Sequence, residues 1–361
     1  MPPDKCLAAV FEEAGGPLRL REFPLVDPPP GHVLARVRMA TICGSDLHTV
    51  EGRRAEPAPL ILGHEILAEV AAPGQEPVRA ANGEPLSAGD RITFTIMASC
   101  GACENCRRGL PQKCRSLFKY GHASCTDALP LSGGFAQYVY LRPGTAIYRL
   151  PDSLSDAEVC PANCALATVV NGIEAVSVKA GERVLVQGAG LLGIYATALL
   201  KDLGAVEIAV TDVNDSRLEV ARRFGADATL NVDGLDDDDV VDGLGEGRFD
   251  CVIEVSGAPS AVRPGLGALA LGGRYVIIGL VCPGSEFTVD GNLIARNYLE
   301  IRGIHNYAPE HLARGLSFLE RTRTDFPYSE LVGCTYPLSE INAAFSAASQ
   351  RKAIRVGVVP D

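Results

Sequence analysis

The hydrophobic positions in the middle of the chain form short apolar runs that end at glycines. Residues 184–186 are all apolar and two of them are β-branched, which predicts a buried parallel strand. Gly188, Gly190 and Gly193 follow, and residues 194–200 continue as an apolar helix. In such a turn the first glycine permits the bend, the second admits a pyrophosphate and the third lets the helix pack close to the strand. The pattern predicts a dinucleotide-binding turn, with an ordinary glycine-rich turn as the alternative.

The next apolar run, residues 207–211, ends at Asp212, where a ligand of the cofactor ribose is expected. A carboxylate there accepts hydrogen bonds from a free 2′-hydroxyl and repels a 2′-phosphate, so Asp212 favours NAD over NADP. The positive end of the helix dipole favours the pyrophosphate. Leu191 and Leu192 at the start of the helix, and Arg217 after Asp212, complete this predicted cofactor-binding set.

Apolar runs and helical segments alternate through this half of the chain, which indicates an α/β fold with a doubly wound parallel sheet. A helix is predicted over residues 214–224. The acidic run at residues 236–239 has no pairing cations in the sequence nearby and is predicted to be a solvated loop. The predicted strands cover residues 184–186, 207–211, 228–231, 251–254, 275–278 and 299–303.

The first part of the chain has a different pattern, with closely spaced strands that are typical of a compact β domain. Residues 33–39 alternate, with Arg36 and Arg38 opposite the apolar positions. Residues 133–140 are predicted to return to this domain. After residue 305 we expect helices over 310–319 and 339–348, and a last strand over 353–359 that rejoins the first domain. The predicted domains are therefore 1–152 together with 305–361, and 153–304, which binds the dinucleotide.

Composition and charge narrow the class of protein. The chain has 361 residues with a formal net charge of −11, which argues against binding to nucleic acid or to an anionic membrane. No run reaches the roughly 18 apolar residues of a membrane span, and no signal peptide is seen, so the cytoplasm is expected. In such a compartment, metal-binding or core roles are expected for the twelve cysteines rather than disulfides.

Four of these cysteines form the strongest local motif in the sequence. Cys100, Cys103, Cys106 and Cys114 are separated by two, two and seven residues and can surround one tetrahedral zinc ion as thiolates. A closed shell of four thiolates leaves no open position, so the predicted role of this lobe, about residues 96–118, is structural. An iron–sulfur cluster and a pair of disulfides are the alternatives.

A second group of metal-binding side chains precedes this lobe. Cys43, Ser45, Asp46 and His48 lie close together, and the sequence Gly-His64-Glu65 follows after a proline-rich loop. A lone cysteine or histidine usually belongs to a core. Two such segments so close in sequence indicate a metal site instead.

Taken together, these motifs and their order resemble the zinc-dependent medium-chain alcohol dehydrogenases over nearly the whole chain. The resemblance implies a GroES-like, mainly β catalytic domain and a Rossmann domain. It also implies a catalytic zinc bound by Cys43, His64 and a later cysteine. Cys164 is favoured for the third ligand because it precedes Thr168 by the family's spacing, with Cys160 as the alternative. Glu65 would touch the metal transiently.

The same resemblance assigns roles to other residues. Asp46 would accept a hydrogen bond from His64, and Ser45 and His48 would relay the alcohol proton. Thr168 and Arg355 would contact the cofactor. The implied reaction is hydride transfer between NAD and a small alcohol or its carbonyl product, with zinc polarising the oxygen. Two zinc ions per chain and a homo-oligomer, dimer or tetramer, are expected.

Three short sequence segments resemble a branch of the family that is associated with phosphonate metabolism. They are residues 52–54, 106–114 and 119–122. We therefore expect Arg54, or Arg53 as the second choice, to bind the anionic end of a hydroxyalkylphosphonate or a similar small alcohol. In the alternative, both arginines lie on a solvated loop and pair with Glu51 or Glu56.

Other functions on the same fold remain as alternatives. One is a polyol, threonine-type or hydrophobic secondary alcohol dehydrogenase of the same family. A second is a non-catalytic nucleotide-binding protein, which would be expected to lose metal ligands. A third is a zinc-free quinone or enoyl reductase, a class that lacks both the Cys43–His64 pair and the four-cysteine lobe.

Overall fold

A computed structural model of the chain describes residues 2–74, 78–126, 128–245, 247–351 and 353–361. The chain divides into two compact units. Unit 1 comprises Met1–Cys164, Tyr307–Glu320 and Tyr328–Asp361, and unit 2 comprises Ala165–Asn306 and Arg321–Pro327. No helix in the described part of the chain is both long enough and apolar enough to cross a membrane.

Unit 1 is mainly β. Its first elements are β1 (Lys5–Phe11), β2 (Arg19–Pro24), β3 (Val33–Thr41), α1 (Gly44–Val50), β4 (Leu60–Ile61), β5 (Glu65–Pro73) and β6 (Arg91–Ala98). They are followed by α2 (Glu104–Arg107), the 3₁₀-helix η1 (Pro111–Lys113), β7 (Phe118–Lys119), β8 (Tyr138–Leu141), β9 (Thr145–Arg149), α3 (Asp156–Val159) and η2 (Cys160–Asn163). The last elements are α10 (Pro309–Thr322, with its final residues in unit 2), η4 (Tyr328–Leu331), β16 (Val332–Pro337), η5 (Leu338–Glu340), α11 (Ile341–Ser349) and β17 (Arg355–Val359).

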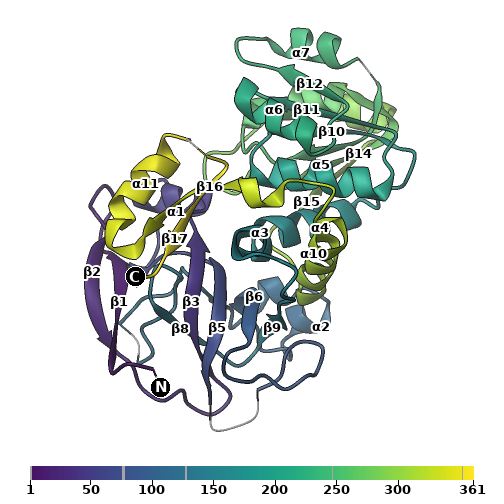
Figure 1. Cartoon of the computed structure of the whole chain (residues 1–361). Coiled ribbons are helices and arrows are strands. Elements are labelled where there is room, and N and C mark those ends of the chain that lie inside the picture. The colour runs from purple at the N-terminus through teal and green to yellow at the C-terminus, as the bar shows by residue number, and fades with distance from the viewer. Residues whose placement is uncertain (1, 75–77, 127, 246, 352) are drawn as a thin grey trace. The chain divides into compact units, whose positions relative to one another are not determined.

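The larger sheet of unit 1 is built around β3. Its strand order is β16–β17–β3–β5–β6–β7, while β8 pairs with β3 and β9 pairs with β6. The predicted alternation in β3 is confirmed, because Ala35 and Val37 are buried while Arg36 between them is exposed. The C-terminal strand β17 pairs antiparallel with β3, so the end of the chain rejoins this unit as expected (Figure 1).

Unit 2 is an α/β layer structure. Its elements are α4 (Ala165–Ala175), β10 (Arg183–Gln187), α5 (Leu191–Leu203), β11 (Glu207–Asp212), α6 (Asp215–Arg223), β12 (Ala228–Asn231), α7 (Asp237–Leu244), β13 (Phe249–Glu254), η3 (Pro259–Ala261), α8 (Val262–Gly267), β14 (Leu269–Ile277), α9 (Gly291–Arg296) and β15 (Glu300–Gly303). Within the described residues the strands form one parallel sheet in the order β12–β11–β10–β13–β14–β15. The order reverses next to β10, which makes this a doubly wound Rossmann sheet.

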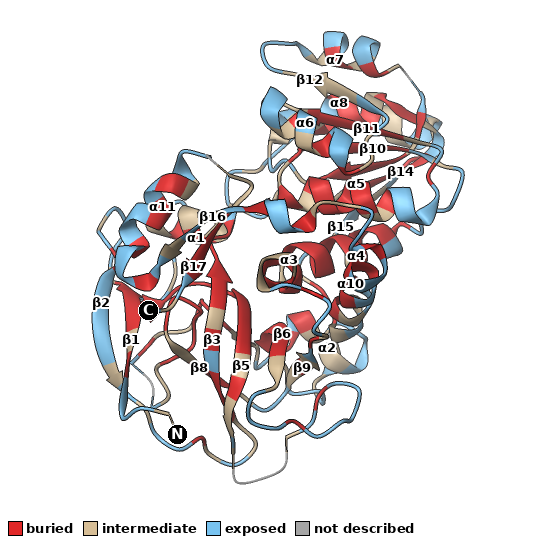
Figure 2. Ribbon diagram, in the orientation of Figure 1, coloured by how far each residue is buried: buried red, intermediate tan, exposed pale blue. Residues whose placement is uncertain are grey.

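The central strands of this sheet are buried on both faces (Figure 2). Leu185 of β10 belongs to a core cluster with Val240 of α7 and Leu266 of α8. Its neighbours along the strand point to the opposite face, and α5 packs on β10 and β11. Helices therefore cover both faces of the sheet, which explains why its strands are continuous apolar runs in the sequence.

The prediction of a loop at residues 236–239 is wrong, although Asp236, Asp238 and Asp239 are exposed to solvent as expected. Asp236 is the N-cap of α7, and its side chain accepts a hydrogen bond from the backbone N–H of Asp239. The carboxylates that follow lie in the first helical turn, where the helix dipole stabilises negative charge. Arg263 also pairs with Asp237 and Asp238, at 3.4 and 3.9 Å. The pairing cation is distant in sequence and was therefore missed.

Unit 1 extends to Cys164, whereas the sequence placed the boundary after residue 152. The segment between them forms α3 and η2, which contact β3, and η2 also contacts β5 and β6. Arg91 of β6 and Arg38 of β3 both pair with Asp156, at 2.7 and 2.8 Å. These contacts hold the segment, with Cys164 at its end, to the β unit.

Candidate active site

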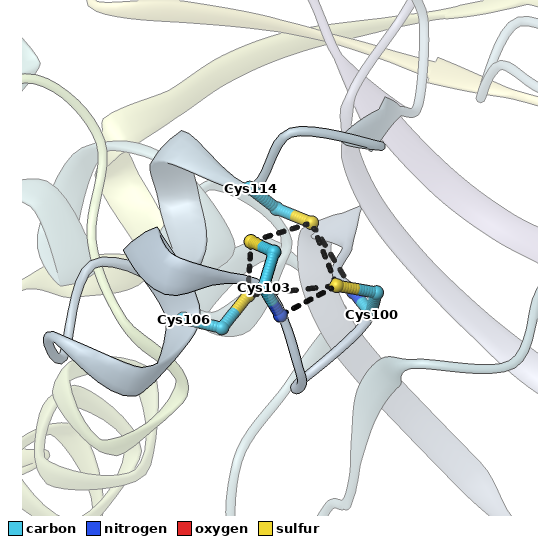
Figure 3. Close-up of side chains that lie close together, drawn as sticks. All are labelled: Cys100, Cys103, Cys106 and Cys114. Carbon is cyan, nitrogen blue, oxygen red and sulfur yellow. Dashed lines mark hydrogen bonds between the residues drawn. The ribbon is translucent and has the colours of Figure 1, made fainter.

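The four cysteines of the predicted structural lobe converge on one point (Figure 3). Their sulfur atoms lie 3.4 Å (Cys100–Cys114), 3.5 Å (Cys103–Cys106), 3.9 Å (Cys103–Cys114) and 4.0 Å (Cys100–Cys106) apart. A tetrahedral zinc ion with Zn–S bonds of about 2.3 Å places its sulfur ligands about 3.8 Å apart. The arrangement therefore matches a zinc site.

The backbone of the lobe favours the charged form of three of these ligands, whereas desolvation raises the pKa of the fourth, Cys106, to about 12. The N–H of Cys103 donates to Cys100 Sγ and the N–H of Cys100 donates to Cys114 Sγ, both at 3.3 Å. Backbone donors lower the pKa of Cys100, Cys103 and Cys114, and thiolates are the form that binds zinc. All four are free cysteines, which disfavours the alternative of two disulfides.

A second cluster brings together residues from three separate segments of unit 1. One ligand atom each of Cys43, His64, Glu65 and Cys164 lies within 4.8 Å of all the others. Cys43 is the N-cap of α1, His64 directly precedes β5, Glu65 begins it, and Cys164 follows η2. A hydrogen bond from Cys164 lowers the pKa of Cys43, and the same bond raises that of Cys164. Two cysteines, a histidine and a carboxylate are a typical zinc donor set.

Asp46 holds the first two of these ligands in place. It is fully buried, and it accepts hydrogen bonds from the backbone N–H of Cys43 at 2.9 Å and of Gly63 at 3.3 Å. His64 Nδ1 lies 3.6 Å from Asp46 Oδ1 and makes no hydrogen bond in the described structure, so the hydrogen bond expected between these two residues is not formed. This side of the imidazole thus faces a carboxylate, which leaves Nε2 for a metal, as second-sphere carboxylates commonly do.

The structure places Glu65 and Arg355 in direct contact, which the sequence did not predict. Arg355 donates to both carboxylate oxygens of Glu65, at 3.0 and 3.1 Å, and Thr41 donates to one of them at 2.5 Å. Arg355 also lies 3.7 Å from Cys43 Sγ. Burial raises the pKa of Glu65, and the Arg355 charge opposes that shift. The two hydrogen bonds between Arg355 and Glu65 offset the free-energy cost of removing both charges from water. They also hold the carboxylate beside the cysteines.

Cys164, and not Cys160, reaches the cluster. The Cys160 thiol points to the Met39 carbonyl at 3.3 Å, and burial raises its pKa. Between the two cysteines, Asn163 Nδ2 donates to the carbonyls of His64 at 3.2 Å and Phe94 at 3.0 Å. Asn163 therefore connects the segment of Cys164 to the segment of His64 by hydrogen bonds. No local sequence pattern predicts this contact.

Ser45 and His48 lie on α1 after Cys43, three residues apart and so on one face of the helix. Burial lowers the pKa of His48, and its Nδ1 is buried without a hydrogen-bond partner in the described structure. No hydrogen bond joins these two described side chains. Ser45 and His48 therefore lie near each other on α1 but are not hydrogen-bonded. A proton relay through them would need a substrate or water molecule to connect the two side chains.

The two arginines of the substrate prediction differ in environment. Arg53 is exposed and pairs with Glu51, as the alternative predicted. Arg54 also forms a pair that the alternative predicted, with its Nε 2.7 Å from Glu56 Oε1, but it is half-buried, with 30% of its side chain exposed. Glu56 also contacts His122 Nδ1 at 2.7 Å, and the His122 ring lies 5.2 Å from that of His64. His122 and the neighbouring Lys119 were missed as site candidates, although both lie in a sequence segment noted above.

In unit 2, the glycine turn has the geometry that its sequence predicted. Gly188 has φ = 105°, in the region that favours glycine. A side chain at Gly193 would place its Cβ 1.8 Å from the Gly188 carbonyl oxygen, so helix α5 packs tightly against the turn. Gly190 is the N-cap of α5 and has open space around its missing Cβ. A cradle of this form at a helix N-terminus accommodates a pyrophosphate.

Asp212 lies at the end of β11, beside this turn. Its carboxylate accepts hydrogen bonds from the backbone N–H of Ala189 at 2.7 Å and of Asn214 at 3.0 Å. Arg217 lies in the first turn of α6, and Thr168 is buried in α4. Leu191 and Leu192 begin α5. The acidic residue and the glycine cradle are therefore adjacent, as a dinucleotide site requires.

Comparisons with known proteins agree with both units. Residues 29–152 match the model of the alcohol dehydrogenase GroES-like domain, and residues 192–321 match that of the zinc-binding dehydrogenases. The chain is 33% identical over 337 residues to an L-threonine 3-dehydrogenase of Yersinia pseudotuberculosis, and the match covers 90% of this chain and 92% of that one.

Solved structures give the same result. An alcohol dehydrogenase of Thermotoga maritima superposes with a TM-score of 0.92 at 28% identity, covering 99% of this chain and 100% of its own. A putative zinc-binding dehydrogenase of Sinorhizobium meliloti, bound to NADP, gives 0.87 at 26% identity with the same coverage. The chain therefore belongs to the zinc-binding dehydrogenases of the alcohol dehydrogenase family, and is a zinc-dependent oxidoreductase that acts on CH–OH groups.

Proposed function

We propose that Cys43, His64 and Cys164 hold a catalytic zinc ion and that the enzyme transfers hydride between NAD and a small alcohol or its carbonyl product. The observation that carries this proposal is the convergence of their ligand atoms, with Glu65, in unit 1. When bound, zinc would polarise the substrate oxygen, and NAD would accept or return the hydride. Cys100, Cys103, Cys106 and Cys114 hold a second, structural zinc ion.

The surrounding residues prepare this site in different ways. Asp46 lies beside His64 Nδ1 without a hydrogen bond to it, and its negative charge on that side leaves Nε2 for the zinc ion. Arg355 neutralises Glu65, so that the carboxylate stays near the metal and is available for brief coordination. Ser45 and His48 carry the alcohol proton away from the site, since burial keeps His48 neutral and able to accept it. Gly188, Gly190 and Gly193 orient the pyrophosphate, and Thr168 and Arg217 of the same unit add contacts to the cofactor. Contact of Arg355 with the cofactor stays a prediction, because its guanidinium pairs with Glu65.

The substrate of this proposal carries a negative charge. Arg54 supports an anionic substrate, because a guanidinium that is partly removed from water is stabilised by anionic partners. Glu56 contacts the guanidinium at Nε, and the other two nitrogens can bind a second anion. A hydroxyalkylphosphonate is one candidate, in keeping with the sequence segments noted above. A threonine-type substrate, with its carboxylate, is the second candidate, and the 33% identity to L-threonine 3-dehydrogenase favours it.

We further propose that the protein is a homo-oligomer and works in the cytoplasm. Leu271 and Tyr298 are 75% and 79% exposed in the single chain. A backbone hydrogen bond from Gly272 to Asn297 brings their segments together. An apolar pair next to the edge strand β15 is a suitable contact for a second copy. The reduced state of the cysteines suits a reducing compartment.

An NAD⁺-reduction screen tests the function. Purified protein should reduce NAD⁺ with alcohols that carry phosphonate, phosphate or carboxylate groups better than with neutral alcohols of the same size. Cys164→Ser should abolish this activity while the thermal unfolding temperature stays near that of the wild type. Activity that survives this substitution, or that survives loss of all zinc, would contradict the proposed site.

A further inference from the structure

A short turn brings two more polar side chains to the edge of the Cys43–His64–Cys164 cluster. Lys119 and His122 flank Gly121, which has φ = 73°. A Cβ at Gly121 would lie 2.7 Å from the Gly63 carbonyl oxygen, so the turn packs directly on the backbone that leads into His64. The His122 ring then lies 5.2 Å from the His64 ring. The sequence around residue 120 is therefore folded against a zinc ligand.

The register of β7 determines where Lys119 points. The rings of Phe118 and Tyr120 contact each other at 5.2 Å, and Arg142 lies over the Phe118 ring at 3.8 Å. Neighbouring residues of a strand point to opposite faces, so Lys119 points away from these rings. Burial and the Arg54 charge lower the pKa of Lys119, whereas Cys164, Glu56 and Cys43 oppose that shift. Among the described residues none forms a hydrogen bond or ion pair with Lys119 Nζ.

Arg54, Glu56 and His122 form a connected group beside this lysine. One carboxylate oxygen, Glu56 Oε1, contacts both Arg54 Nε and His122 Nδ1 at 2.7 Å. His122 Nε2 is buried without a hydrogen-bond partner in the described structure. A second proton on the ring would have no acceptor there, so the ring carries no charge. With Lys119 included, the group holds two positive charges and one negative charge. One positive charge is left over in a partly desolvated place, where an unpaired ion is costly.

We propose that Lys119 and Arg54 together bind one singly charged group of the substrate, such as a carboxylate. The inference rests on the proposed function and narrows its substrate class, because one net positive charge is neutralised by a carboxylate and overcompensated by a phosphonate dianion. Glu56 positions Arg54 with its remaining nitrogens free for the anion. The planar guanidinium then offers two parallel donors, and the lysine adds a point charge.

The test uses small hydroxy compounds of similar size that differ in charge. They are 3-hydroxybutanoate, its neutral amide 3-hydroxybutanamide, and 2-hydroxypropylphosphonate. Wild-type holoenzyme is compared with Lys119→Met, with the charge-conserving Lys119→Arg, and with Arg54→Gln. Arg36→Gln serves as control, because it removes an exposed cation of the same unit that pairs with Glu69. A second measurement is the binding of butanoate to each holoenzyme by titration calorimetry, without turnover.

Lys119→Met and Arg54→Gln should each raise KM for 3-hydroxybutanoate and Kd for butanoate by about tenfold or more, the effect of losing one charged hydrogen bond. Kinetics with the amide, zinc content and the Arg36→Gln values should stay as in the wild type. Lys119→Arg should recover most of the loss. The wild type should prefer the carboxylate to the phosphonate.

Three results would overturn the inference. Equal losses on the acid and the amide would show that Lys119 has no role in charge recognition. Loss of zinc in Lys119→Met would show that its charge serves the cysteine thiolates instead. A preference for the phosphonate would refute the single-charge argument. Failure of the proposed function would look different, since the wild type would then oxidise none of the alcohols while the butanoate titration still tests Lys119 and Arg54.

Discussion

At the scale of single residues, Asp212 illustrates how one side chain serves both the fold and a ligand. Its two oxygens accept hydrogen bonds from Ala189 and Asn214, so it closes the glycine turn onto the end of β11. Each carboxylate oxygen has further lone pairs, which leaves capacity for a ribose hydroxyl. The same negative charge repels a 2′-phosphate. Cofactor choice and the local backbone are therefore coupled in this residue.

We predict that replacing Asp212 by Gly together with Val213→Arg shifts cofactor preference toward NADP⁺. The kcat/KM ratio of NAD⁺ to NADP⁺ should fall by roughly tenfold or more, because a hydrogen bond to ribose is lost and a phosphate partner is gained. Steady-state kinetics with both cofactors measure the ratio. Val213→Arg alone is the control, and Val213 is 53% exposed, so it should fold normally. An unmodified enzyme that already prefers NADP⁺ would contradict the role of Asp212.

At the scale of elements, the four-cysteine lobe contains too little core to fold by its own packing. Helix α2 has no buried residue, and η1 has only Gln112. Elements this small depend on a metal or on disulfides for their structure. The catalytic cluster differs, because β3, β5 and β6 hold Cys43, His64 and Cys164 through backbone pairing and through contacts with η2.

The two zinc sites should therefore respond differently to the loss of one ligand. Cys106→Ser should leave about one zinc per chain, lower the thermal unfolding temperature and promote aggregation. Cys164→Ser should also leave about one zinc per chain, with the fold kept and turnover lost. Metal analysis, circular dichroism and activity measure the three effects.

Cys282→Ser is the matched control for both variants, because Cys282 is a half-buried free cysteine outside both clusters. It should retain two zinc ions and wild-type activity. An active wild-type protein with fewer than about one zinc per chain would contradict both assignments.

At the scale of the whole molecule, unit 2 exposes two large apolar side chains, Leu271 and Tyr298, near β14 and β15. Leu271 lies in β14, and Tyr298 precedes β15, the edge strand of the sheet. Exposed apolar groups beside a strand edge favour pairing with another chain unless they are covered. The arrangement suits a symmetric contact between identical copies.

We predict that the protein has the mass of two or more chains in light scattering after gel filtration. Leu271→Asp and Tyr298→Asp should each shift the mass toward one chain, because a carboxylate in a shared apolar contact is costly to desolvate. Val206→Asp is the control, since Val206 is a 63% exposed apolar residue elsewhere in unit 2. A wild-type protein that elutes as a single chain would contradict the proposal.

The sequence alone determined the features that depend on local spacing. The glycine turn with its acidic residue, the strand and helix alternation and the four-cysteine motif were each contained in short segments. Their geometry follows from covalent connection and from backbone conformations that few residues adopt. Local spacing wrongly predicted a loop at residues 236–239. There the N-cap Asp236 and the pairing of Arg263 with Asp237 stabilise the start of helix α7.

Only the tertiary structure decided which distant residues meet. It brought Cys164 rather than Cys160 to Cys43 and His64, joined Arg355 to Glu65, and separated the half-buried Arg54 from the exposed Arg53. It also placed Lys119 beside the cluster through the packing of Gly121 on Gly63. These contacts depend on strand register and on close backbone approach between segments that lie far apart in the chain, and a one-residue shift in register would turn each side chain to the opposite face.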